Sequence, residues 1–102
     1  MFGSHLRFES REKIRHKATL FGMYVVPGER GRGLGRELVV AVLETARTRP
    51  GVGVVQLTVS EGNDAALQLY RRAGFVAFGT EPLAVRVGMG FVAKVHLWRE
   101  LG

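Results

Sequence analysis

The sequence predicts an α/β (α+β) protein whose mixed central sheet joins a parallel β-α-β core to a C-terminal antiparallel hairpin. Two observations predict the core. Apolar runs over residues 18–26 and 52–59 bracket a stretch, 35–47, with the apolar spacing of a helix. A third observation predicts the hairpin, because a turn-forming Gly-Met-Gly separates an alternating run over 83–87 from a returning run over 91–101.

Length and composition limit the chain to one domain, residues 1–102. The hydrophobic content of 46% is ordinary for a globular protein, and no apolar run approaches the ~20 residues of a membrane span. The N-terminus lacks the apolar core of a signal peptide. The sequence has no cysteine, which excludes disulfides, thiolate metal sites and a cysteine nucleophile. We therefore expect a cytoplasmic protein without a membrane partner.

The net charge of +6 predicts a partner rich in phosphate. Arginines gather at 30, 32 and 36 and again at 71 and 72, and aromatic residues do not interleave with them as a base-stacking surface requires. This clustering favours a small phosphorylated cofactor over nucleic acid. A basic nucleic-acid-binding module remains the alternative.

The first half of the chain yields two strands and a helix. Residues 5–10 alternate in the manner of a half-buried strand, and the near-continuous apolar run over about 17–26 predicts a central strand covered on both faces, which Pro27 ends. The helix over 35–47 is followed by a second buried strand, 52–59. A strand, a helix and a strand within about 40 residues predict a right-handed parallel crossover.

The second half predicts a short helix and a hairpin. Asn63 or Asp64 caps a helix that ends near Ala73, with Gly74 as the residue after its C-terminus. The elements that follow are a strand at 75–78, a bulge at 79–82, the alternating run at 83–87, a turn at 88–90 and a strand at 91–101.

The segment from Tyr24 to Arg36 carries the strongest functional signal. Glycines and arginines interleave between a strand and a helix, where free helix N–H groups and the macrodipole favour an anion such as a pyrophosphate. A P-loop requires Lys and Ser/Thr after its second glycine, but Leu34 and Gly35 follow Gly33. The dinucleotide fingerprint requires a third glycine where Arg36 stands. The pattern that fits is Arg-x-x-Gly-x-Gly, formed by Arg30, Gly33 and Gly35.

This pattern resembles the coenzyme-A-binding motif of the GCN5-related N-acetyltransferases (GNAT family). A second stretch, residues 56–75, makes the resemblance specific. Its matching positions, in the family's order and spacing, are Asn63, Ala66, Leu69, Tyr70, Gly74 and Phe75. The resemblance covers nearly the whole chain, including the last two strands.

The resemblance implies transfer of an acetyl group from acetyl-CoA, the cosubstrate, to a primary amine by direct attack, without a metal. It implies that the pyrophosphate lies on the loop amides and that the two parallel strands splay to admit the pantetheine arm. A main-chain N–H near Tyr24 or Val25 would stabilise the oxyanion, and Tyr70 would protonate the thiolate as general acid. The implied cofactor-binding residues are Tyr24, Val25, Val26, Arg30, Gly31, Arg32, Gly33, Leu34, Gly35, Arg36, Asn63 and Ala66.

The general base stays open. Glu61 lies beside the expected site, and His16 precedes the strand that enters it, but a surface role fits each as well. Ser60 has no visible His or Asp partner, which argues against a serine nucleophile, and the histidines at 5, 16 and 96 lack metal-ligand spacing.

The sequence departs from the family at its N-terminus, because only about 20 residues precede the strand at 18–26. The strand and two helices that wall the acceptor side of the family's domain are missing, so the fold is expected to be N-terminally truncated. An exposed sheet edge invites pairing, and we expect a homodimer that covers it. A relative that binds acetyl-CoA without catalysis is the other alternative to an active enzyme. The amine acceptor is not identified.

Overall fold

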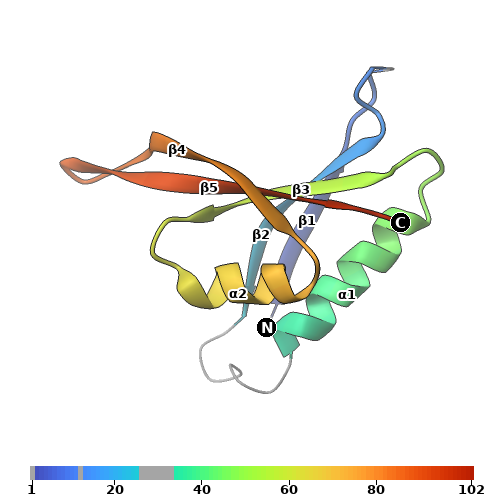
Figure 1. The fold of residues 1–102 in the computed structure, drawn as a ribbon, viewed down its shortest axis with the longest axis horizontal. Helices are drawn as coiled ribbons and strands as arrows, with labels where there is room; N and C mark the ends of the chain where they lie inside the picture. Colours follow the sequence, from blue (N-terminus) through green and yellow to red (C-terminus); the bar gives the residue numbers. More distant parts are fainter. Residues whose placement is uncertain (1, 12, 26–33) are drawn as a thin grey trace.

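A computed structural model describes residues 2–11, 13–25 and 34–102 of the chain. These residues form one five-stranded sheet of order β1-β2-β3-β5-β4 and two helices (Figure 1). The elements are β1 Phe2–Phe8, β2 Lys17–Val25, α1 Leu34–Arg47, β3 Val54–Ser60, α2 Asp64–Arg72, β4 Val76–Val87 and β5 Gly90–Glu100. The predicted mixed sheet, parallel core and C-terminal hairpin are all confirmed, with bounds that differ by a few residues.

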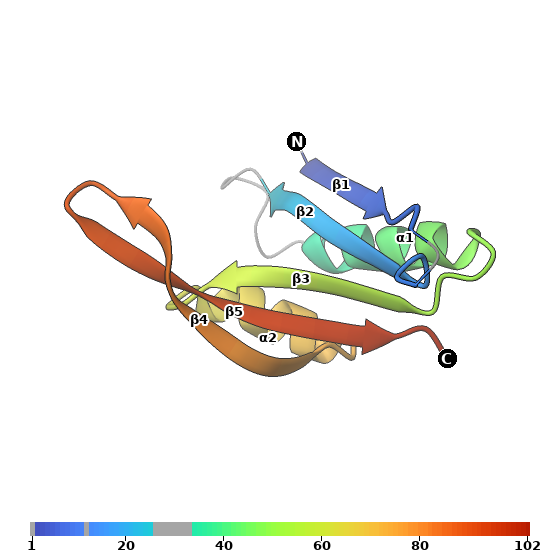
Figure 2. The same ribbon diagram turned by 90° about the horizontal axis from the view of Figure 1, so that it is seen from above.

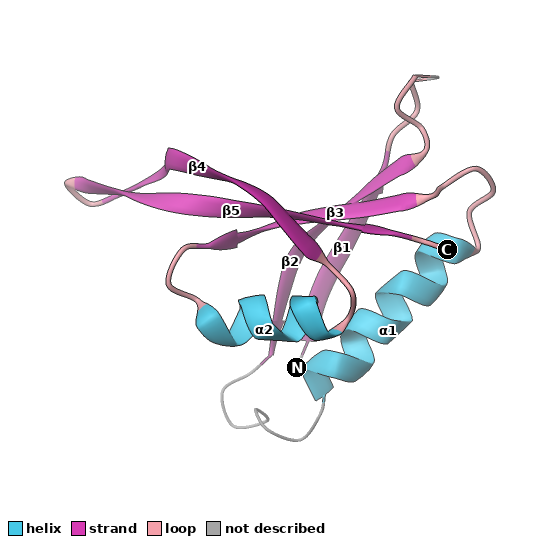
Figure 3. Ribbon diagram, viewed as in Figure 1, coloured by secondary structure: helices cyan, strands magenta, loops and turns pink. Residues whose placement is uncertain are grey.

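Both helices lie on the same face of the sheet (Figures 1 and 3). That face supplies the core, in which apolar side chains of β2, β3 and β5 pack against those of α1 and α2. Its buried members are Ala18, Leu20, Val39, Val42, Leu43, Ala46, Val55, Leu57, Val59, Tyr70, Phe75 and Leu97. One contiguous cluster is what a domain of this size needs in order to fold.

The prediction that β2 is covered on both faces is wrong for the described part of the chain, and β3 is not buried throughout as predicted. Ala18 and Leu20 are buried at 0% and 4% exposure, but the side chain of Phe21 is 42% exposed. In β3, buried residues likewise alternate with partly or fully exposed ones. The apolar run of β2 was misleading because Phe21 lies on the face of the sheet without helices, which we call the open face. There the guanidinium of Arg7 lies 5.4 Å from the centroid of the Phe21 ring.

The two parallel strands pair only at their beginnings. Lys17, Ala18 and Thr19 of β2 pair with Val54, Val55 and Gln56 of β3, and the described remainders of the two strands do not pair with each other. Figure 2 shows the two strands separating toward their carboxyl ends. The predicted splay is therefore present between the described residues 20–25 and 57–60.

The β4–β5 hairpin is long and irregular. It closes through Gly88 and Met89, because Val87 pairs with Gly90, and Gly88 has φ +59°. The register shifts between Ala77 and Gly79 and again between Glu81 and Val85. Gly79, Thr80 and Glu81 pair regularly with β5, so the irregularities fall on either side of them, at residue 78 and at residues 82–84, and the bulge predicted at 79–82 is misplaced by a few residues.

Helix α2 has both of its predicted end signals. The Asn63 side chain accepts a hydrogen bond from the Ala66 N–H at 3.2 Å, so Asn63 rather than Asp64 is the N-cap. Gly74 follows the helix with φ +94°, a conformation that glycine adopts without strain. These two residues fix the length of the helix and hence the position of Tyr70 in its last turn.

Candidate active site

The separation of β2 from β3 defines the candidate site. On the outer side of β2, Tyr24 and Val25 pair with Gly3 and Phe2 of β1. Backbone groups of a strand alternate between its two sides, so the side of Tyr24 and Val25 that faces β3 has no strand partner in the described sheet. The opening therefore offers main-chain donors and acceptors to an extended ligand, and its splayed strands have the form that the family resemblance implies.

The start of α1 lies at the carboxyl end of β2. Helix α1 begins at Leu34, and Gly35 and Arg36 occupy its first turn, with Arg36 exposed. The first-turn N–H groups have no partner within the helix, which makes this end electropositive. Among the predicted cofactor-binding residues, Val26, Arg30, Gly31, Arg32 and Gly33 lie outside the described residues.

The start of α2 supplies two further predicted residues. Asn63 is exposed and its carboxamide oxygen is turned back onto the helix, while Ala66 is half-buried. Asn63 thus has a structural task as N-cap whatever else it does.

Tyr70, the predicted general acid, is 6% exposed. Its ring meets Phe75 edge to face, with centroids 5.6 Å apart. Burial raises the pKa of the Tyr70 phenol above its usual value of 10.0, so this hydroxyl carries its proton at neutral pH. No buried side-chain oxygen among the described residues lacks a partner, and the described part of the chain shows no hydrogen bond to the Tyr70 hydroxyl.

The structure separates the two base candidates considered from the sequence. The backbone carbonyl of His16 accepts hydrogen bonds from Gly53 and Val54, which places His16 at the opposite end of β2 from the opening. Glu61 directly follows β3, and its N–H donates to the Ala93 carbonyl at 2.9 Å. Its side chain is exposed at the carboxyl end of β3, which is the end of the sheet where β2 and β3 separate.

Sequence reasoning missed a polar group on the face of the sheet opposite the helices. The His96 imidazole contacts the Glu81 carboxylate at 3.0 Å, and the Lys94 ammonium donates to the Ser60 hydroxyl at 3.1 Å. The alternation of His96 with the buried Leu97 was a usable signal for the face. The diagonal contact with Glu81 was not, because the register shift between Glu81 and Val85 places Glu81 opposite Lys94 rather than His96.

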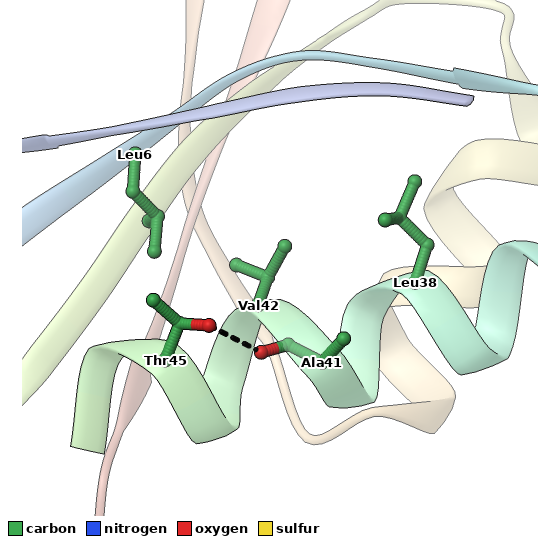
Figure 4. A pocket seen from close by; sticks show the side chains of 5 residues that line it. All are labelled: Leu6, Leu38, Ala41, Val42 and Thr45. Atoms are coloured by element: carbon green, nitrogen blue, oxygen red, sulfur yellow. Dashed lines mark hydrogen bonds between the residues drawn. The ribbon is translucent and has the colours of Figure 1, made fainter. Parts of the chain in front are cut away.

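An apolar hollow of about 250 Å³ lies between β1 and α1 (Figure 4). It is lined by Leu6, Leu38, Ala41, Val42 and Thr45. The Thr45 hydroxyl donates to the Ala41 carbonyl of its own helix, so the lining presents no titratable group. The hollow can hold an apolar side chain but has no chemistry of its own.

Within residues 2–11, 13–25 and 34–102, no three His, Cys, Asp or Glu side chains are grouped as metal ligands. In the same ranges, no helix is long and apolar enough to cross a membrane.

A mixed sheet whose parallel pair opens beside a helix N-terminus, with a buried protonated tyrosine on the next helix, has the architecture of an acyl-CoA N-acyltransferase. The profile described as the Acetyltransferase (GNAT) family matches residues 5–75. This chain belongs to that family.

Three known proteins illustrate the relationship. The N-alpha-acetyltransferase RimI of Mycobacterium tuberculosis is 46% identical over 63 residues, which are 62% of this chain and 37% of RimI. An acetyltransferase of the GNAT family from Streptococcus pneumoniae superposes with a TM-score of 0.88 at 26% identity, over 97% of this chain and 58% of that one. The Salmonella typhimurium protein yncA, a putative acetyltransferase solved with its cofactor acetyl-CoA, gives a TM-score of 0.80 at 25% identity over 99% and 56%. The chain thus spans between about two fifths and three fifths of these relatives.

Proposed function

We propose that this protein transfers the acetyl group of acetyl-CoA to a primary amine by direct attack of the amine on the thioester. The observation that carries the proposal is the opening between β2 and β3, where the register ends after Thr19 and Gln56. Such an opening admits a chain-like ligand that pairs with strand backbone. Membership of the GNAT family and the acetyl-CoA cofactor of yncA support this choice of ligand.

Acetyl-CoA is proposed to lie along three segments. The pantetheine arm pairs with the main chain of Tyr24 to Val26, and the pyrophosphate lies on the loop and on the first turn of α1. Asn63 and Ala66 at the start of α2 line the other side. The loop residues of this proposal are Arg30, Gly31, Arg32, Gly33, Leu34, Gly35 and Arg36.

The catalytic step uses groups from both sides of the opening. An N–H of Tyr24 or Val25 stabilises the oxyanion of the tetrahedral intermediate, a contribution of about 3–4 kcal/mol for one such donor. Tyr70 donates its proton to the departing thiolate, and the raised pKa of its phenol keeps that proton available at neutral pH. The sequence has no cysteine, so an acyl-cysteine intermediate is impossible.

We place the protein in the cytoplasm, consistent with a cysteine-free sequence. We further propose a homodimer. In the described sheet β1 is an edge strand, and the apolar hollow lies beside it. An unpaired edge next to apolar surface favours association with a second copy. Light scattering over a wide concentration range tests this, since a constant monomeric mass would rule it out.

Calorimetric titration with CoA tests the cofactor assignment. We expect saturable binding that weakens in Arg36→Ala, because the guanidinium at the start of α1 would no longer attract the diphosphate. Arg47→Ala is the matched control, since Arg47 is an exposed arginine at the other end of the same helix, paired with Glu44 at 3.0 Å. Equal affinity in wild type and Arg36→Ala would remove Arg36 from the site.

Release of free thiol from acetyl-CoA with a panel of amines tests catalysis. Binding of CoA without thiol release would leave a binding protein rather than an enzyme. Absence of both would reject the proposed function.

A further inference from the structure

The face of the sheet without helices presents a polar row beside the opening. The inward side chains of β3 and β5 are buried against the helices, so the residues between them face the other way. On this open face Thr58 of β3 lies directly opposite His96 of β5. The last pair between β2 and β3 involves Gln56, so Thr58 borders the opening and His96 lies one strand further from it.

The Glu81 carboxylate contacts His96 and not Lys94, although Lys94 is its partner across the hairpin. The register places Glu81 of β4 directly across from Lys94, yet its Oε1 lies 3.0 Å from Nε2 of His96. The Lys94 ammonium instead donates to Ser60 on β3. The ring of Phe78 contacts the imidazole, with centroids 5.8 Å apart. Glu81 and Lys94 are the charged groups that face His96 from its own and the adjoining strands.

This contact fixes which imidazole nitrogen is available. An ionised carboxylate only accepts hydrogen bonds, so Nε2 of neutral His96 donates and Nδ1 keeps the lone pair. The two nitrogens flank one ring carbon, and their hydrogen-bonding directions diverge widely. Because β5 lies between β3 and β4, an Nε2 turned toward β4 leaves Nδ1 facing back toward β3 and the opening.

We propose that His96 is the proton acceptor for the incoming ammonium group and that Glu81 is its positioning residue. The inference rests on the proposed acetyl transfer and adds the base that the sequence left open. With the helices and Tyr70 on the covered face, the amine reaches the thioester from the open face, where His96 lies. Because Thr58 lies between His96 and the opening, bound water carries the proton from the amine to Nδ1 in this proposal.

The proton balance is simple. His96 Nδ1 takes one proton from the ammonium, and the neutral amine then attacks the thioester carbonyl carbon. The C–S bond breaks with transfer of the Tyr70 proton to sulfur. The attacking nitrogen loses its second proton through water, which restores the Tyr70 hydroxyl, and His96 returns its proton to solvent. The products are the N-acetyl amide, free CoA thiol and one proton.

The test is the pH dependence of kcat/KM for two acceptors of different basicity. One is a short peptide with a free N-terminal alanine, whose amine has a pKa of about 7.7–8.0, and the other is Nα-acetyl-lysine, with a side-chain pKa of about 10.4. The proteins are wild type, His96→Gln, Glu81→Gln and, as matched control, His16→Gln at the far end of β2. Calorimetry with CoA is run on each.

We expect His96→Gln to lower kcat/KM about 100-fold for both acceptors near pH 7, with CoA affinity unchanged. The loss should shrink above about pH 8 for the peptide, because its amine is then already neutral, and persist for the lysine. Glu81→Gln should give a smaller loss of the same shape, and His16→Gln none.

A loss that is equal at every pH for both acceptors would mean that His96 has only a structural role, and an unchanged rate in His96→Gln would remove it from the mechanism. Both results overturn this inference and leave acetyl transfer standing. A wild-type protein that binds CoA but releases no thiol would instead reject the transfer reaction and His96 with it. If only one acceptor is turned over, the pH trend for that acceptor decides.

Discussion

The two faces of the sheet are built from neighbouring residues of the same strands but have different tasks. Leu57 is 3% exposed beneath the helices, and the next residue, Thr58, is exposed on the open face. Leu97 is fully buried, and the imidazole of its neighbour His96 contacts the Glu81 carboxylate at 3.0 Å. The comparison teaches that one face stabilises the fold, which leaves the other face free to carry polar groups near the opening.

The largest effect on stability should come from truncating a side chain that is buried on the covered face, the face on which both helices pack. Leu57→Ala removes a buried side chain from the middle of the core and should lower the free energy of unfolding by about 2–5 kcal/mol, because the cavity cannot collapse between a strand and two helices. Denaturant unfolding followed by circular dichroism measures it.

Thr58→Ala is the control from the open face of the same strand. It should cost less than about 1 kcal/mol, since an exposed strand residue contributes little beyond its β-propensity. Similar losses of unfolding free energy in the two variants would contradict the conclusion that the covered face supplies most of the stability.

Much of the covered face was predictable from the sequence, because burial leaves a periodic trace. The helical spacing of α1, the cap at Asn63 and the glycine at 74 each obey a local rule that needs no knowledge of the tertiary structure. The apolar run of β2 led to one error, since periodicity cannot distinguish a strand covered on both faces from one whose exposed Phe21 lies under Arg7.

The open face was less predictable, because its contacts are set by register. The turn at Gly88 alone would place Glu81 opposite His96, but the shift between Glu81 and Val85 places Glu81 opposite Lys94, so that Glu81 reaches His96 diagonally. The sequence shows where a bulge can occur and not how many residues it adds. The predicted roles of Tyr70 and of the cofactor-binding residues stay predictions.

The second effect concerns chemistry on the covered side. Tyr70→Phe keeps the ring that packs on Phe75 and removes only the hydroxyl, so turnover should fall about 100-fold while CoA affinity and folding change little. Thiol release and calorimetry on one preparation measure the two effects. Equal turnover in both proteins would exclude Tyr70 as the acid and leave proton transfer to the open face alone.

The raised pKa of Tyr70 also has a consequence for stability. The unfolded chain ionises this phenol near its ordinary value, whereas burial opposes ionisation in the folded protein. The contribution is fully present below about pH 10 and is lost as pH rises toward the folded-state pKa. Unfolding free energies measured from about pH 9 upward should fall for wild type and fall less for Tyr70→Phe; parallel curves would contradict the shift.

A smaller effect on stability tests the contact between Arg99 of β5 and the C-terminal end of α2. Gly74 has φ +94°, and a Cβ there would lie 2.8 Å from Nε of Arg99, which donates to the Ala73 carbonyl at 2.7 Å. Gly74→Ala should therefore cost about 1–3 kcal/mol, from backbone strain and from displacement of this hydrogen bond. Gly62→Ala separates the two causes, because Gly62 has φ +95° but nothing within 4 Å. Equal losses would mean that Arg99 contributes nothing.

The smallest effect belongs to the other end of α2. Asn63→Ala removes the acceptor of the Ala66 N–H and should lower the free energy of unfolding by about 1 kcal/mol, whereas Asn63→Asp keeps an acceptor and should be nearly neutral.

The same pair of variants addresses the proposed contact with acetyl-CoA. If Asn63 only caps the helix, CoA affinity follows stability, so that Asn63→Asp binds like wild type. If its carboxamide also donates to the cofactor, Asn63→Asp weakens CoA binding without destabilising the fold, because a carboxylate offers no N–H and repels the phosphates. Calorimetry on the aspartate variant therefore decides whether α2 is merely held in place at this residue or also holds the ligand.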